Sequence, residues 1–204
     1  MDLHNLAGLL LDMDGTLVNS DAAVERAWYS WAAEHGVDGA EATTLAHGSP
    51  SEPTVRKLLP DLDEAATAIA TARQLELQYD DLSDVVAAPG ALDLIGVLAE
   101  RRLPWAVVTS ADLRLARARL SAAGIAPPVL VTIDDTAAGK PDPAGYLLAA
   151  EKLGVPIARC LVVEDADVGL EAGRAAGART AGLRGLTADI TLTTLTDLAD
   201  LLRT

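Results

Sequence analysis

The sequence of 204 residues contains no phenylalanine, only three tryptophans and three tyrosines, and 16 basic against 30 acidic residues. The resulting formal net charge of −14 argues against a nucleic-acid-binding protein, because such proteins present positive charge to phosphates. The same charge opposes binding to anionic membrane surfaces. So few aromatic side chains also cannot supply a platform for stacking bases. We therefore expect neither a nucleic acid nor a membrane as partner.

Cysteine is nearly absent as well. The single Cys160 cannot form an internal disulfide or a thiolate zinc site, and its apolar neighbours predict a buried side chain. The chain opens without a basic segment, and its longest apolar runs are too short to span a bilayer. These absences predict a cytoplasmic protein without a signal peptide.

Half of the residues are apolar, which is enough for a sizeable core. Short apolar runs predict buried parallel strands at Gly8–Asp12, Trp105–Thr109, Val129–Ile133, Cys160–Glu164 and Arg179–Leu183. Between them, Ala-rich and Leu-rich stretches predict helices at Ala91–Glu100, Asp112–Ala123, Pro143–Leu153 and Gly169–Ala176. This alternation is typical of an α/β fold with helices on both faces of a parallel sheet.

One segment breaks the alternation. Between about Asn19 and Val86 no strand is expected, and the pattern predicts helices at Asp21–His35, Pro53–Leu59 and Asp63–Tyr79. Trp28 and Trp31 share the apolar face of the first of these helices, which favours packing inside the segment over stacking on a ligand. The sequence thus predicts a core of residues 1–18 and 87–204, interrupted by a helical unit of residues 19–86.

Asp12 and Asp14 follow the first predicted strand and are two residues apart. In open α/β sheets, ligands bind at the carboxyl ends of the strands, so acidic groups there indicate a site. The alternative is that both aspartates only cap a turn. The other strand ends decide between these interpretations.

Further polar groups follow the later strands: Thr109 and Ser110, then Lys140 between glycine and proline, then Glu164 and Asp165. The carboxyl ends of parallel strands meet at one edge of the sheet, so these groups are expected to converge. Hydroxyls and loop amides there can hold phosphate oxygens, although Thr-Ser is also a common helix cap. Clustered carboxylates repel one another unless a cation lies among them, and oxygen ligands suit Mg²⁺.

In this order, the four motifs resemble those of the haloacid dehalogenase-like superfamily of phosphotransferases, over nearly the whole chain. The resemblance implies a Rossmann-like core, and the helical unit of residues 19–86 is similar to the C1 cap of that family. Within the family, the chain is similar to the β-phosphoglucomutase-like branch, which includes sugar, polyol and glycolate phosphatases. His47-Gly48, shortly before Ser51–Arg56, looks like the cap loop of deoxyglucose-6-phosphate and glycerol-phosphate phosphatases.

The resemblance implies a role for each motif residue. Asp12 would be the nucleophile that forms an aspartyl-phosphate, and Asp14 the general acid and base. Thr109 and Ser110 would bind the transferring phosphoryl group. Lys140 would pair with the nucleophile and the phosphate and offset their negative charge.

The resemblance also implies a Mg²⁺ ion, held by the Asp12 carboxylate, the Asp14 carbonyl and Asp165, with Glu164 as a further ligand or an outer partner. Many relatives have serine where this chain has Ala166, so one possible outer hydroxyl is missing. Displacement of a halide needs neither a second aspartate nor Mg²⁺. Asp14 therefore favours phosphoryl transfer over dehalogenation.

The expected function is Mg²⁺-dependent hydrolysis of a small phosphate monoester (a sugar, polyol or glycolate phosphate) by a monomer or weak homodimer. A mutase of the β-phosphoglucomutase type is one alternative, but Val24 stands where the mutases carry a histidine. A non-catalytic binding protein on the same fold is another, but none of the central motif residues is lost.

Substrate choice is expected to come from the cap, because the core contacts only phosphate and metal. His47 and Arg56 are the candidate substrate-binding residues there. The alternatives are that His47 caps a helix or lies in a core, and that Arg56 forms an exposed ion pair with Glu52 four residues away.

Overall fold

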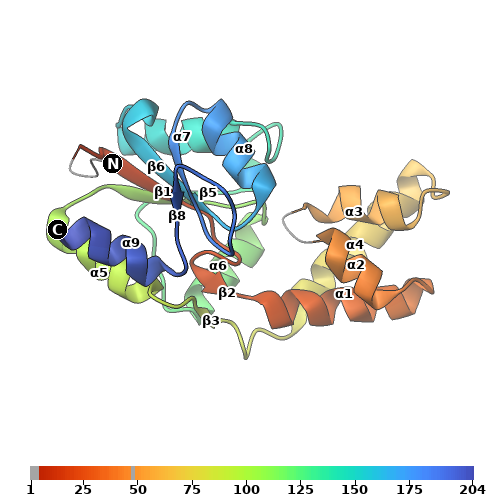
Figure 1. Ribbon diagram of the computed structural model, residues 1–204. Helices are drawn as coiled ribbons and strands as arrows, with labels where there is room; N and C mark the ends of the chain where they lie inside the picture. The colour runs from red at the N-terminus through yellow and green to blue at the C-terminus, as the bar shows by residue number, and fades with distance from the viewer. Residues whose placement is uncertain (1–4, 47–48) are drawn as a thin grey trace.

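The computed structural model describes residues 5–46 and 49–204. Its centre is a six-stranded parallel sheet in the order β5-β4-β1-β6-β7-β8 (Figure 1). The strands are β1 (Gly8–Leu11), β4 (Trp105–Val108), β5 (Leu130–Val131), β6 (Cys160–Glu164), β7 (Arg179–Gly182) and β8 (Ile190–Thr191). The first strand of the chain thus lies inside the sheet, between β4 and β6. Its last residue, Leu11, pairs with Val107 of β4 and with Val163 of β6.

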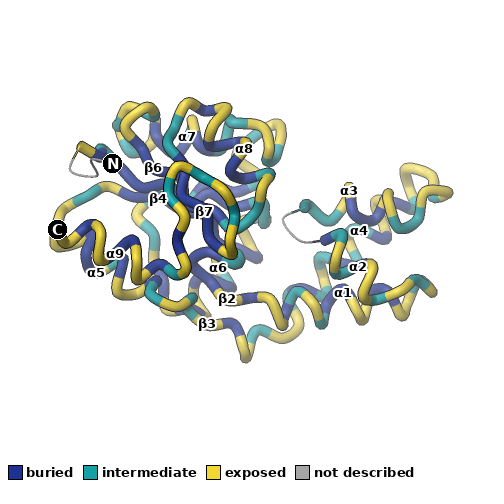
Figure 2. Tube along the Cα trace, in the orientation of Figure 1, coloured by how far each residue is buried: buried dark blue, intermediate teal, exposed yellow. Residues whose placement is uncertain are grey.

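Helices cover both faces of this sheet because each central strand is apolar on both sides. Leu9 and Leu11 point to one face, and Leu10 points to the other. The first face packs against helices of one apolar cluster: α5 (Ala91–Arg101), α6 (Leu113–Ala122) and α9 (Leu195–Arg203). The second face packs against α7 (Ala144–Leu153) and α8 (Asp167–Ala175). In Figure 2 the labelled central strands β4, β6 and β7 are mostly dark blue, the colour of buried residues.

A group of helices, here called the insert, lies to one side of the sheet (Figure 1). It consists of α1 (Asp21–His35), α2 (Gly39–Ala46), α3 (Ser51–Leu58) and α4 (Glu64–Asp80). Trp28 and Trp31 are buried in an apolar cluster of the insert itself, as expected. A short antiparallel pair, β2 (Val18–Asn19) with β3 (Val86–Ala87), joins the insert to the core.

The prediction of an α/β fold with a parallel sheet and helices on both faces is confirmed. Five of the α-helices and strands in the described residues were not predicted: β2, β3, β8, α2 and α9. The three strands have two residues each, too few for a periodic pattern. In α9, by contrast, Leu195, Leu198, Ala199 and Leu202 are buried at helical spacing after a Thr194–Asp197 capping box, so its sequence does carry a helix pattern.

Two smaller expectations concern burial. Cys160 is fully buried, as predicted, and burial raises the pKa of its thiol to about 11. Among the helices of the described residues, none combines the length and the apolar content needed to cross a membrane.

Candidate active site

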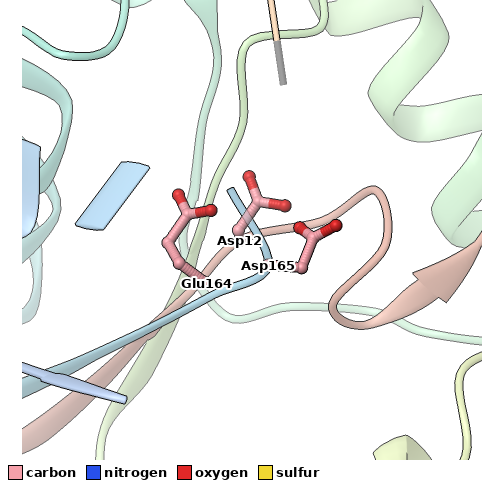
Figure 3. A group of neighbouring side chains, drawn as sticks. All are labelled: Asp12, Glu164 and Asp165. Carbon is pink, nitrogen blue, oxygen red and sulfur yellow. The ribbon is translucent and has the colours of Figure 1, made fainter. Parts of the chain in front are cut away.

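The carboxylates predicted to converge do so at the carboxyl ends of β1 and β6. These strands pair in parallel with Leu11 opposite Val163, and the Asp12 amide donates to the Val163 carbonyl at 3.0 Å. Asp12 therefore lies beside the end of β6. Oxygen atoms of Asp12, Glu164 and Asp165 all lie within 4.8 Å of one another (Figure 3).

Lys140 extends into this cluster and is almost fully buried. Its Nζ donates hydrogen bonds to Asp12 Oδ1 and, at 3.0 Å, to the Val108 carbonyl. It also lies 2.6 Å from a Glu164 oxygen. Burial alone would lower the pKa of Lys140, but the Asp12 and Glu164 carboxylates raise it above its ordinary value. Lys140 is therefore a cation at neutral pH. The Tyr146 hydroxyl donates to Glu164 from α7 and fixes that carboxylate.

The cluster has more negative than positive charge. Burial and the neighbouring Glu164 raise the pKa of Asp12 well above its ordinary value, and the same two causes raise the pKa of Asp165 to about 6. Lys140 lowers both pKa values only in part, and Arg184, whose Nε lies 3.1 Å from an Asp165 oxygen, lowers that of Asp165 in part. Three mutually close carboxylates with unbalanced charge fit a divalent cation that prefers oxygen ligands.

This charge imbalance predicts a pH-dependent stabilisation by Mg²⁺. Since Asp165 titrates near 6 in the folded metal-free protein and near 3.8 when unfolded, the folded state holds the extra proton, and its stability falls as pH rises through that window. A divalent cation that binds to the cluster would displace this proton. We expect Mg²⁺ to raise the melting temperature more at about pH 7.5 than at about pH 5. Thermal unfolding with and without Mg²⁺ measures this. An equal rise at both pH values, or an undiminished rise in Asp165→Asn, would contradict it.

Asp14 follows in a tight turn after β1. The turn passes through Gly15, which has a φ of 82° that residues with a side chain rarely adopt. Asp14 Oδ1 accepts a hydrogen bond from the Ser20 hydroxyl at 2.6 Å, and Oδ2 lies 2.9 Å from Nη1 of Arg119. Both oxygens of the predicted acid–base group therefore have partners.

A glycine on α8 makes room for Glu164. A Cβ added to Gly169 would lie 1.9 Å from Glu164 Oε1, so any side chain there displaces the carboxylate that Lys140 contacts. We expect Gly169→Ala to lower kcat by about tenfold or more, because small misplacements in an active site are costly. Gly96→Ala on α5 is the matched control: its Cβ meets nothing within 4 Å, so kcat should not change and stability should rise by about 1 kcal/mol. Equal kcat values for the two variants would refute this role of Gly169.

A cavity of about 330 Å³ lies between the core and the insert. The core contributes every predicted motif residue to its lining: Asp12, Asp14, Thr109, Ser110, Lys140, Glu164 and Asp165. The insert contributes Val24, Trp28, Ser49, Ser51, Glu52, Thr71 and Gln78, among others. The structure therefore brings the polar strand ends together, and the insert lines the same cavity.

The two predicted cap residues differ from this group. Arg56 is not among the residues that line the cavity. It forms surface ion pairs with Glu52 at 2.8 Å and with Glu64 at 2.8 Å. The pair with Glu52 is the expected alternative to a substrate contact, and a substrate contact of Arg56 stays a prediction. His47 lies outside the described residues.

Arg119 is a site residue that the sequence analysis did not single out. It projects from α6 into the cavity, with an exposed fraction of 2%. On α6 it shares the buried stripe with Leu115, Ala116 and Leu120. An arginine on the apolar face of an amphipathic helix is a signal that could have revealed it, because buried arginines are paired.

Comparisons with known proteins agree with this geometry. The profile described as haloacid dehalogenase-like hydrolase matches residues 6–177. Hexitol phosphatase A of Escherichia coli is 42% identical over 171 residues, which cover 83% of this chain and 79% of that protein. 2-Deoxyglucose-6-phosphate phosphatase 1 of Saccharomyces cerevisiae is 35% identical over 193 residues, covering 85% and 78%.

The same relationship holds for a solved structure. The crystal structure of a hydrolase from Pseudomonas syringae has a TM-score of 0.86 at 26% identity, with 97% of this chain and 98% of that chain covered. The family model and the relatives each cover most of the chain, and the chain belongs to the haloacid dehalogenase-like hydrolase family.

Proposed function

We propose that this protein is a Mg²⁺-dependent phosphatase that hydrolyses small sugar or polyol phosphates through an aspartyl-phosphate on Asp12. The observation that carries the proposal is the position of Asp12. It lies beside the Lys140 ammonium and close to two further carboxylates, and it lines a cavity that Asp14 also lines. This combination supplies a nucleophile, positive charge beside it and a separate proton donor.

The chemistry uses each of these groups. An Asp12 oxygen forms a bond to phosphorus while the bond from phosphorus to the ester oxygen breaks, and Asp14 gives that oxygen a proton. Asp14 then takes a proton from water, whose oxygen attacks phosphorus and releases Asp12 and phosphate. Lys140 offsets the repulsion between the carboxylate and the dianionic ester, and Thr109 and Ser110 hold the phosphoryl oxygens.

We propose that Asp12, the Asp14 carbonyl and Asp165 hold the Mg²⁺ ion, with Glu164 as a further or outer ligand. When bound, the ion would supply positive charge next to the nucleophile and the phosphoryl oxygens. The mutual proximity of the three carboxylates supports this assignment.

Two observations support a hydroxyl-rich leaving group. The relatives above are named as phosphatases of a hexitol phosphate and of a deoxysugar phosphate. In addition, Thr71 Oγ1 on α4 is buried without a hydrogen-bond partner, and Thr71 lines the cavity. Because buried polar atoms are normally paired, this hydroxyl favours a ligand that carries hydroxyls.

Water rather than a second sugar is the proposed acceptor. Val24 lines the cavity from α1 at the position where mutases of the branch carry a histidine, and its side chain cannot exchange protons. The named relatives are phosphatases as well. The insert would act as a cap over the site. The protein would work in the cytoplasm, where cysteines stay reduced, and its single cysteine is free and buried. It would act as a monomer or weak homodimer.

The experiment is a screen of phosphate release from sugar, polyol, glycolate and nucleotide monophosphates and p-nitrophenyl phosphate, with Mg²⁺. We expect release from hexitol or sugar phosphates at kcat/KM values well above that for p-nitrophenyl phosphate. No release from any ester, or release that Asp12→Asn does not abolish, would refute the function.

The same screen tests the cap residues. If His47 or Arg56 contacts the leaving group, His47→Ala or Arg56→Ala will change the ranking of kcat/KM among esters and leave p-nitrophenyl phosphate nearly unchanged. A uniform factor across all esters would instead assign these residues to stability. For Arg56 the surface ion pairs provide the physical reason for that second outcome.

A further inference from the structure

Arg119 links the predicted acid–base carboxylate to the insert. Its side chain leaves α6 of the core and is buried. Nη1 lies 2.9 Å from Asp14 Oδ2, and Nη2 donates to Gln78 Oε1 at 2.8 Å. Gln78 belongs to α4, so one planar guanidinium contacts the active-site turn and the insert at the same time.

Arg119 and Ser20 together set the orientation of Asp14. Ser20 donates to one carboxylate oxygen at 2.6 Å, and Arg119 contacts the other. A proton donor must lie within hydrogen-bond reach of the leaving oxygen, so the orientation of Asp14 decides whether it can act. An Asp14 side chain that has lost Arg119 keeps a partner on one oxygen only and can rotate.

The insert holds Arg119 through a short hydrogen-bonded chain. Gln78 Nε2 donates to Gln74 Oε1 at 2.7 Å, and the Ser51 hydroxyl donates to the same oxygen at 2.6 Å. Gln74 is fully buried. These hydrogen bonds hold the Gln78 side chain in place where it contacts Arg119. The contact between Gln78 and Arg119 exists only while α4 lies against the core.

We propose that Arg119 is a positioning residue that orients Asp14 for proton transfer, and that Gln78 makes this orientation depend on contact between the insert and the core. The proposal rests on the phosphatase function above, because it assigns Arg119 a task in that reaction. The competing assignment is a direct contact with substrate, since Arg119 Nε is buried without a partner. The two assignments differ in whether the effect of Arg119 passes through Asp14.

A double-mutant cycle separates them. Arg119→Met, Asp14→Asn and the double variant are compared by kcat/KM for sorbitol 6-phosphate. We expect Arg119→Met alone to lower kcat/KM by about tenfold or more, and to lower it by less than about twofold in the Asp14→Asn background. With p-nitrophenyl phosphate, whose leaving group departs without a proton, the Arg119→Met effect on kcat/KM should be several times smaller.

Matched variants complete the test. Arg117 lies exposed on the same helix, so Arg117→Met should keep the wild-type kcat/KM. Gln78→Leu should lower kcat/KM for sorbitol 6-phosphate, and this effect too should vanish in Asp14→Asn. Arg119→Lys keeps the buried charge but not the planar fork, so it should recover part of the loss. It also replaces Arg119→Met in the cycle if that variant does not fold.

Two results would overturn the proposal. Wild-type kcat/KM in Arg119→Met would show that Asp14 does not need it, and factors that multiply in the double variant would assign Arg119 to substrate binding or to the fold. Both differ from a failure of the proposed function, in which the wild-type protein itself releases no phosphate from any ester.

Discussion

Replacing Asp12 by asparagine is expected to reduce turnover of every phosphate ester by several orders of magnitude, about 10⁴-fold or more, as when a covalent nucleophile is deleted. The neutral amide cannot attack phosphorus, so the covalent step is lost. Phosphate release from sorbitol 6-phosphate and p-nitrophenyl phosphate measures the loss.

The fold should survive this change. Burial and Glu164 oppose ionisation of Asp12, so a neutral side chain relieves repulsion in the metal-free protein, and the melting temperature should not fall. Asp61→Asn, at an exposed position of the insert, is the control and should retain full activity. Turnover of Asp12→Asn within about tenfold of wild type would remove Asp12 from the mechanism.

Removal of divalent metal is expected to have an effect of similar size. With EDTA, phosphate release should fall to background, and added Mg²⁺ should restore it. The reason is charge: three close carboxylates with Lys140 would repel a dianionic ester unless a divalent cation balances them. The measurement is phosphate release as a function of free Mg²⁺.

The choice of metal adds a control. Ca²⁺ takes longer bonds and more ligands than Mg²⁺, so it should bind at the cluster but support little turnover. Asp165→Asn should raise the Mg²⁺ concentration needed for half-maximal activity, whereas Asp167→Asn, whose carboxylate is not part of the cluster, should not. Full activity in metal-free buffer would contradict the proposed site.

The sequence predicted the fold class and the meeting of the strand ends, because both depend on local patterns. Apolar runs that end in Asp12, Thr109 and Glu164 identify parallel strands, and the geometry of such sheets places their ends together. The boundaries of these strands were correct to within one residue, except at the end of the edge strand β5, which stops two residues earlier than predicted.

Apart from α9 and the position of Arg119 on the apolar face of α6, which the local pattern does carry, what was not predicted depends on contacts between distant residues. The contact of Arg119 with Asp14 exists only in the fold, and Arg56 pairs with Glu64 only through the packing of α3 on α4. The short strands β2 and β3 likewise exist only as a pair, because neither has a pattern of its own. Local patterns therefore predicted the polar core residues that line the cavity, whereas the residues that the insert contributes to the lining required the structure.

The central claim is a phosphoryl group carried by Asp12, and chemical trapping tests it directly. Wild-type protein mixed with substrate and Mg²⁺ is quenched within one turnover and treated with borohydride, which reduces an acyl phosphate to an alcohol and releases the phosphate. Mass spectrometry of the peptide with Leu9–Leu11 should then show Asp12 converted to homoserine, only when substrate was present. Unmodified Asp12 while the protein turns over substrate, or conversion at another carboxylate instead, would contradict the account.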